Sequence, residues 1–344
     1  MNIILDAHGG DNAPLEVIKG AAMAVREYGV QVTLCGRQDD ILSAAEESGI
    51  PLTNLEGIKI APASQVLPMD VDPTEILNSY SGSSMAVGLK LLAEGRGDAF
   101  VTAGNTGAVV VGSSLVVKRI KGIKRAAIAT VVPTTESPYL LMDSGANVEC
   151  RPEMLQQFGI MGSAYMSKVL NIEHPRVGVI NIGTEDNKGL ELQIEAGKLL
   201  RGSPVNFIGN VEARELPLGG CDVAVCDGFT GNVILKLTEG MGKWISVELK
   251  KILLKNLSTK LAAALIKDGI DSFRKQMDYT EHGGAPLLGI AKPVIKAHGS
   301  SNGKAFKNAI RQAKRMVENQ MIDTITEGLA ALKTQQEEQK NADE

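Results

Sequence analysis

The uncharged stretch AFVTAGNTGAVVVGSSLVV (residues 99–117) is the segment that decides the fold class. Its length raises the question of a membrane span, but Thr102, Asn105, Thr106 and three glycines interrupt the apolar residues. A buried strand at Ala99–Thr102, a glycine-containing turn and a buried helix account for the pattern better. The stretch therefore predicts one strand–turn–helix unit of an α/β protein.

Similar units recur along most of the chain. Several of the apolar runs are continuous and rich in β-branched residues, as in strands of a parallel sheet that helices cover on both faces. The segments between them carry apolar residues at helical spacing, for example Val17, Ala21 and Val25. This alternation predicts a layered α/β sandwich. The predicted strands are Ile3–Leu5, Val30–Leu34, Ala99–Thr102, Ala126–Val132, Tyr139–Met142, Val177–Ile180, Val205–Ile208, Val223–Val225, Leu287–Ile290 and Val294–Ala297.

One region departs from the alternation. Residues 229–277 have an almost entirely helical pattern, with a joint near Asn256–Ser258. We expect residues 1–334 to form a single large α/β/α domain that includes this helical segment. The polar end QQEEQKNADE (335–344) is predicted to be disordered.

Composition excludes several classes of protein. The 344 residues include 36 Lys and Arg against 40 Asp and Glu, and only 3% aromatic residues, so the basic surface and stacking platforms of a nucleic-acid binder are missing. Four scattered cysteines and four scattered histidines show no metal-ligand spacing, so no metal site is predicted. Neither a G-x-G-x-x-G nor a P-loop motif occurs, and no nucleotide cofactor is predicted. Unpaired thiols and the lack of a signal-peptide pattern favour a cytoplasmic protein.

Glycine combined with small polar residues follows five of the predicted strands. In an open α/β sheet such loops gather at the carboxyl ends of the strands, where helix N-termini favour phosphate. Each loop alone is also explained as a strand-to-helix turn with a helix cap, but five in one chain favour an anion site. The loops are DAHGGDNAP (6–14), TAGNTG (102–107), NIGTEDNKG (181–189), DGFTGN (227–232) and HGSSNG (298–303).

The last loop contains GSSNG (299–303), which matches the G-x-S-x-G nucleophile elbow. The catalytic triad of that motif requires a histidine after the serine in the chain, and no histidine follows Ser301. A nucleophilic serine is therefore the minor alternative to anion binding. His8, His282 and His298 lie in glycine-rich loops and are the better candidates for proton or anion chemistry.

Eight motifs occur in order from Met1 to about Gln320: DAHGGDNAP, TAGNTGA, LLMDSGANVEC followed by RP, NIGTEDNKG, NFIGNVEAR, DVAVCDGFTGNV, GGAPLLGI and IKAHGSS. Together they resemble the PlsX family of bacterial acyl-ACP:phosphate acyltransferases. The resemblance implies a Rossmann-like α/β/α sandwich, similar to phosphotransacetylase and to isocitrate and isopropylmalate dehydrogenases. It also implies transfer of a fatty acyl group from acyl carrier protein to inorganic phosphate, a homodimer, and delivery of the acyl phosphate to a membrane glycerol-3-phosphate acyltransferase in phospholipid synthesis.

The sequence departs from the family pattern at two places. His8 stands where relatives usually have an apolar residue, and Leu77–Gly82 stands where they usually carry a basic cluster. Three alternative functions stay open: a phosphotransacetylase that uses short acyl-CoA, a decarboxylating dehydrogenase with the related fold, and a catalytically inactive scaffold at a lipid surface.

In the implied reaction phosphate is itself the nucleophile, so the protein must orient it and stabilise the developing oxyanion. For Asp143, capping of the turn before Gly145 is an equal alternative. The predicted catalytic residues are Lys188, Asn232, His298 and Asp143. The predicted phosphate ligands are Gly9, Gly10, Asp11, Asn105, Thr106, Gly107 and Ser300, with Asp6, His8, Asn147, Thr184, Glu185, Asp227 and Thr230 in support.

The helical segment carries a basic and apolar pattern. Apolar residues Ile252–Leu254, Leu257, Leu261 and Leu265–Ile266 are accompanied by Lys250, Lys251, Lys255, Lys260 and Lys267. Such a helix suits contact with an anionic lipid surface. A helix pair packed in the core or at a dimer interface, with lysines reaching to solvent, explains it equally well.

Overall fold

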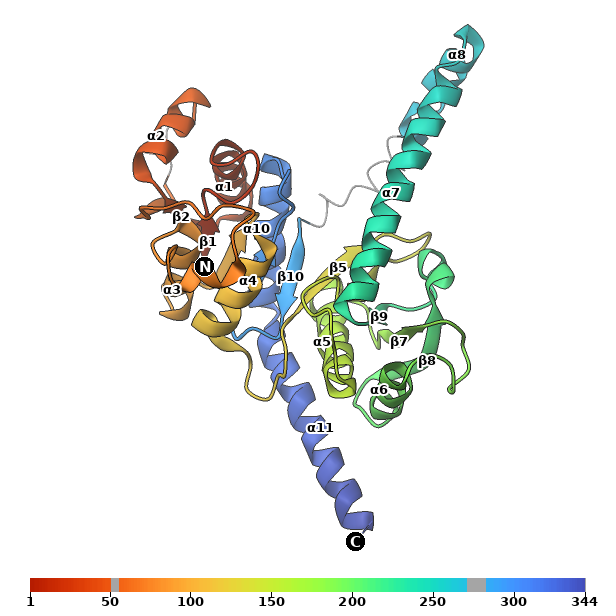
Figure 1. The fold of residues 1–344 in the computed structure, drawn as a ribbon. Helices are drawn as coiled ribbons and strands as arrows, with labels where there is room; N and C mark the ends of the chain where they lie inside the picture. The colour runs from red at the N-terminus through yellow and green to blue at the C-terminus, as the bar shows by residue number, and fades with distance from the viewer. Residues whose placement is uncertain (51–55, 271–282, 344) are drawn as a thin grey trace.

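The computed structural model describes residues 1–50, 56–270 and 283–343, and it has the predicted layered α/β architecture (Figure 1). Eleven strands of the described chain form one sheet, in the order β3-β2-β1-β4-β11-β10-β5-β6-β9-β7-β8. The strands are β1 (Asn2–Asp6), β2 (Gln31–Gly36), β3 (Ile58–Pro62), β4 (Ala99–Thr102), β5 (Ala127–Val132), β6 (Tyr139–Met142), β7 (Arg176–Asn181), β8 (Asn206–Glu212), β9 (Val223–Val225), β10 (Ala285–Leu288) and β11 (Val294–Lys296). All ten predicted strands are present, and within the described residues β3 is the one strand that was not predicted.

Helices cover both faces of the sheet. The α-helices are α1 (Leu15–Tyr28), α2 (Gln38–Glu47), α3 (Ser84–Ala93), α4 (Thr106–Gly112), α5 (Pro152–Leu170), α6 (Glu191–Arg201), α7 (Gly228–Leu253), α8 (Leu257–Leu265), α10 (Gly303–Glu318) and α11 (Met321–Asp343). Two short 3₁₀-helices, η2 (Pro73–Leu77) and η4 (Ala213–Leu218), and one short π-helix, η3 (Ser113–Lys118), are also present among the described residues. The stretch 99–117 forms β4, α4 and most of η3, as predicted.

The hydrophobic core is divided between the two faces. On one face α1, α5, α6, α10 and α11 pack on the sheet through residues such as Phe158 and Phe306. On the other face α3 and α4 cover the first half, where Leu89 packs with Phe100. The base of α7 covers part of the second half through Ile234 and Leu235. On this second face, α4 and α7 therefore lie on either side of the central strands of the sheet.

The sheet reverses direction at its centre. Strands β1 to β4 and β11 are parallel to one another, and so are β6, β9, β7 and β8. Between these two groups lie three antiparallel pairs, β11–β10, β10–β5 and β5–β6. An odd number of reversals places the carboxyl ends of β7 and β9 at the opposite edge from those of β1, β4 and β11. The expectation that all five glycine-rich loops gather at one edge is therefore wrong.

Two helices extend beyond the sheet (Figure 1). Helix α7 continues into α8, with a capping box at Asn256 where the sequence predicted a joint. Helix α11 includes residues 335–343, which the sequence predicted to be disordered; the Gln, Glu and Lys residues there are good helix formers. Among the described residues, no helix combines the length and the apolar character that a membrane crossing needs.

Candidate functional site

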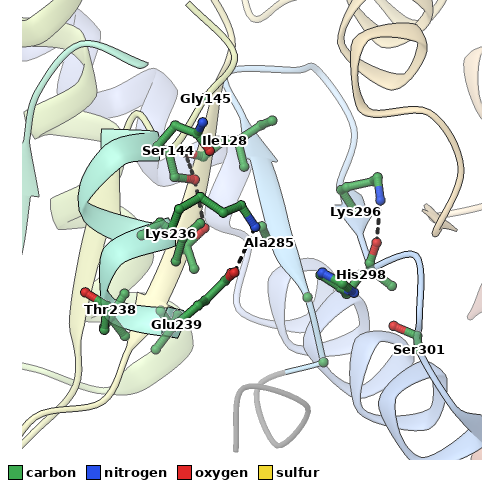
Figure 2. A pocket seen from close by; sticks show the side chains of 18 of the residues that line it. Ile128, Ser144, Gly145, Lys236, Thr238, Glu239, Ala285, Lys296, His298 and Ser301 are labelled. Atoms are coloured by element: carbon green, nitrogen blue, oxygen red, sulfur yellow. Dashed lines mark hydrogen bonds and ion pairs between the residues drawn. The ribbon is translucent and has the colours of Figure 1, made fainter. Parts of the chain in front are cut away.

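A cavity of about 800 Å³ lies on the sheet face between α4 and α7, over the central strands (Figure 2). Helix α7 lines one side, and the end of β11 with the loop after it lines the other. Its lining residues are Thr106, Ile128, Thr130–Pro133, Ser144, Gly145, Asn232, Leu235, Lys236, Thr238, Glu239, Gly242, Lys243, Ser246, Gly283–Ala285, Lys296–His298, Ser301 and Ala305.

Much of the cavity wall is apolar. Strand β5 and the residue after it contribute Ile128, Val131, Val132 and Pro133, and α7 contributes Leu235. Two hydroxyl groups interrupt this wall: Thr130 Oγ1 lies 2.7 Å from the Oγ of Ser144. A mostly apolar cavity with a few polar groups is the usual form of a small-molecule site.

The β11 side of the cavity carries a partly buried ammonium group. Lys296 Nζ donates hydrogen bonds to the carbonyl oxygens of Ala103 and Ala297, at 3.2 and 2.6 Å. Burial lowers the pKa of Lys296 to about 8, against the opposing effect of the Asp6 and Asp11 carboxylates. Lys296 is not among the predicted site residues, although a lysine within the short apolar run VIKA was a usable signal.

His298 and Ser300, both predicted site residues, contact each other in the loop after β11. The backbone N–H of Ser300 donates to His298 Nδ1 at 3.2 Å, and Ser300 Oγ lies 2.8 Å from the same nitrogen. His298 lines the cavity, whereas Ser300 does not. Ser301, the residue of the nucleophile-elbow alternative, also lines the cavity, and its N–H donates to the His298 carbonyl.

The glycines of the first loop serve close packing. A Cβ on Gly9 would lie 2.6 Å from Asp6 Oδ2 and 2.8 Å from both Gly104 N and Thr102 Oγ1. Gly10 has a φ of +105°, a left-handed conformation that favours glycine. The next residue in this loop, Asp11, donates its N–H to the Gly299 carbonyl at 2.8 Å. These residues, predicted to bind phosphate, therefore connect the loops after β1, β4 and β11. They lie outside the cavity lining.

His8 also has a structural role in that loop. Its Nε2 accepts the backbone N–H of Arg37 at 3.0 Å, so this nitrogen carries no proton. Burial lowers the pKa of His8, although Asp6 and Asp40 oppose the shift. The ring joins the end of β1 to the end of β2, and it is absent from the cavity lining.

The loop before α4 is organised by its asparagine. Asn105 Oδ1 accepts the N–H of Ala108 at 2.9 Å, and its Nδ2 donates to the carbonyls of Met69 and Val71. This is a helix N-cap, which satisfies a backbone donor that the helix itself cannot. Of the three residues predicted in this loop, Thr106 lines the cavity.

Asp143 is buried and satisfied by amide donors. One oxygen accepts the N–H groups of Ile128, Gly145 and Ala146, and the other accepts the backbone N–H and side-chain Nδ2 of Asn147, all at 2.7–3.2 Å. Burial raises the pKa of Asp143, and the amide donors oppose that shift. This is the geometry of the turn-capping alternative, and Asn147 belongs to the same cap.

Asp227 starts α7 in a similar manner. Its carboxylate accepts the backbone N–H and the hydroxyl of Thr230, both at 2.8 Å. One turn further along α7, Asn232 lines the cavity. Gly231 lies against the Asp143 carbonyl, where there is no space for a Cβ. The predicted residues of this loop thus position α7, and Asn232 is the one that reaches the cavity.

Lys188, Thr184 and Glu185 lie in the loop after β7, at the opposite edge of the sheet. All three are exposed and absent from the cavity lining. The structure does not bring them together with His298 and Asn232, and their catalytic roles stay predictions. The segment Leu77–Gly82 is also outside the cavity lining, and His282 lies outside the described residues.

Comparisons with known proteins show the family of this chain. The family described as "Fatty acid synthesis protein" matches residues 1–324. A phosphate acyltransferase of Alkaliphilus oremlandii is 49% identical over 332 residues, which cover 96% of this chain and 98% of the relative. A phosphate acyltransferase of Acetivibrio thermocellus is 43% identical over 340 residues, 98% of this chain and 99% of the relative.

Solved structures share the fold. A phosphotransacetylase from Streptococcus pyogenes has a TM-score of 0.63 at 17% identity, with 92% of this chain and 94% of that chain covered. The EutD phosphotransacetylase from Staphylococcus aureus has a TM-score of 0.60 at 16% identity and the same coverage. The chain belongs to the PlsX family of fatty acid synthesis proteins, whose members are named phosphate acyltransferases.

Proposed function

We propose that this acyltransferase moves a long-chain fatty acyl group from acyl carrier protein to inorganic phosphate, as the first committed step towards glycerol-3-phosphate acylation. The observation that carries the proposal is the cavity, which combines an apolar wall with a partly buried ammonium on its β11 side. Each methylene buried on such a wall contributes roughly 0.8 kcal/mol of binding free energy. A palmitoyl chain uses that wall, whereas an acetyl group leaves it empty.

The reaction needs no covalent acyl-enzyme. A phosphate oxygen attacks the thioester carbonyl carbon, the carbon–sulfur bond breaks, and the thiolate of the carrier takes up a proton. The products are acyl phosphate and free carrier thiol. The protein contributes by orienting phosphate and thioester and by stabilising the oxyanion in between. Asn232 from α7 and His298 from the β11 loop reach the cavity from opposite sides and are our candidates for that stabilisation.

The test is release of free thiol from palmitoyl-ACP, with inorganic phosphate, with sulfate at equal ionic strength, and without either. Acetyl-CoA is the parallel donor, and hydroxylamine traps any acyl phosphate as a hydroxamate. We expect release and trapping with phosphate and palmitoyl-ACP. Turnover confined to acetyl-CoA would favour the short-chain phosphotransacetylase. Thiol release without phosphate would indicate a thioesterase, with Ser301 as the candidate nucleophile. No thiol release from either donor would refute acyl transfer.

We further propose that a second copy of the chain covers the arm formed by α7 beyond Ser246 together with α8. Apolar side chains are largely exposed along the two helices, including Leu257 at 75% and Leu261 at 62%. Exposed apolar patches of this kind indicate a contact surface. The basic residues of the arm also suit an anionic membrane, to which a greasy product must be delivered. Light scattering measures the first contact and flotation with anionic vesicles measures the second; a monomer that does not float would refute both.

A further inference from the structure

Lys296 is a charged residue at the end of an otherwise apolar strand. Its neighbours Val294 and Ile295 are completely buried, in the cores on the two opposite faces of the sheet. Because side chains alternate along a strand, Lys296 projects to the same face as Val294, which is the face that carries the cavity. Figure 2 shows its side chain across the cavity from Lys236.

The described chain holds this ammonium with backbone groups. Two carbonyl oxygens, of Ala103 and Ala297, accept from Nζ. An ammonium carries three N–H donors, so one remains beyond these two bonds. Asp6 and Asp11 are near enough to favour the charged form, but no ion pair within the described chain joins either of them to Lys296. A partly buried ammonium with an N–H donor left over and no ion-pair partner is suited to binding an anion.

We propose that Lys296 Nζ binds an oxygen of the inorganic phosphate nucleophile at the β11 side of the cavity. This deepens the proposed function and rests on it. Lys296 takes no covalent part: it holds one phosphate oxygen while another attacks the thioester carbon, with the acyl chain along the apolar residues of β5 and Leu235 of α7. Two carbonyls fix the direction of the ammonium, so the phosphate is positioned before the acyl donor enters.

Two variants and one control test the assignment. Lys296→Gln removes the charge and keeps amide N–H donors for the carbonyls, and Lys296→Met removes both. Lys90→Met is the matched control, because Lys90 is exposed on α3 and its loss changes net charge equally. The readouts are the rise in Tm with phosphate concentration, and the KM values for phosphate and for palmitoyl-ACP.

In both Lys296 variants we expect the KM for phosphate to increase by at least about tenfold. The phosphate concentration that gives half of the Tm rise should increase equally, because a charged hydrogen bond to phosphate is lost. The KM for palmitoyl-ACP and the behaviour of Lys90→Met should stay near the wild-type values. The proposal would be overturned if Lys296→Gln folds and its Tm responds to phosphate as the wild type does. It would also be overturned if the wild-type protein shows no response to phosphate, or if neither Lys296 variant folds. A Lys296-dependent Tm response without acyl transfer would support this site and refute the proposed reaction alone.

Discussion

Asp143→Asn distinguishes the two roles that the sequence left open for this residue. The carboxylate accepts three N–H groups on one oxygen and two on the other, and all five donors are amides. An asparagine keeps one acceptor oxygen and replaces the other by an NH₂ group, which is itself a donor. In its better orientation the oxygen keeps Ile128, Gly145 and Ala146, and the NH₂ group faces the two donors of Asn147.

The magnitude follows from those two lost bonds. A buried donor left without an acceptor costs about 1–3 kcal/mol, so the substitution should lower the free energy of unfolding by roughly 2–6 kcal/mol. For a chain of 344 residues this corresponds to a fall in Tm of at least about 3 °C. Since native proteins are stable by only about 5–15 kcal/mol, the loss is readily measured.

The assay is denaturant unfolding followed by circular dichroism, with thiol release measured on the same preparations. Asp227→Asn is the matched control, because asparagine caps a helix about as well as aspartate and the Thr230 hydroxyl can reorient. We expect a clear loss of stability in Asp143→Asn and almost none in the control. A fully stable Asp143→Asn that has lost acyl transfer would refute the capping role and return Asp143 to the reaction.

Three further predictions rest on single side chains. Asn105→Ala should destabilise the protein by about 1–2 kcal/mol in denaturant unfolding, because it removes a helix cap and two ties to the preceding loop. Acyl transfer should fall as pH rises through about 8, where Lys296 loses its proton despite the Asp6 and Asp11 carboxylates, and a pH–rate profile of Lys296→Gln should lack that fall. Ser301→Ala should retain phosphate-dependent thiol release, since phosphate is the nucleophile; loss of release at unchanged Tm would favour the serine mechanism.

The fold was largely predictable, but the directions of the central strands were not. Continuous apolar runs such as Ala126–Val132 identify a strand with two covered faces, and the structure confirms it as β5. The same pattern fits a strand of either direction, so nothing local indicated that β10 and β6 run against β5. Loops that follow strands gather at one edge of a sheet only where all the strands are parallel. For a fully parallel sheet, the loop with Lys188 was expected beside the loop with His298.

The site was harder to predict because the residue types that cap helices and turns are also those that bind anionic ligands. Asn105, Asp143 and Asp227 were selected as small polar residues in glycine-rich loops, and the structure shows each accepting backbone N–H groups at a turn or helix start. Sequence alone does not reveal whether such an oxygen faces a helix or a ligand. A lysine in an apolar strand is a sharper signal, since lysine is rarely withdrawn from solvent unless it is paired, and the partly buried Lys296 is the residue that this rule identifies.

Helix α7 connects the cavity to the surface that we propose a second copy covers. Its first turns pack on the sheet through Ile234 and Leu235, its middle lines the cavity with Glu239 and Lys243, and its outer part is mostly exposed. A long helix fixed mainly at one end has few interactions to hold its middle over the sheet. Pairing of the outer part with a second copy would restrict that movement and keep the apolar wall closed around an acyl chain. On this argument, dimer formation and acyl-chain binding should stabilise each other.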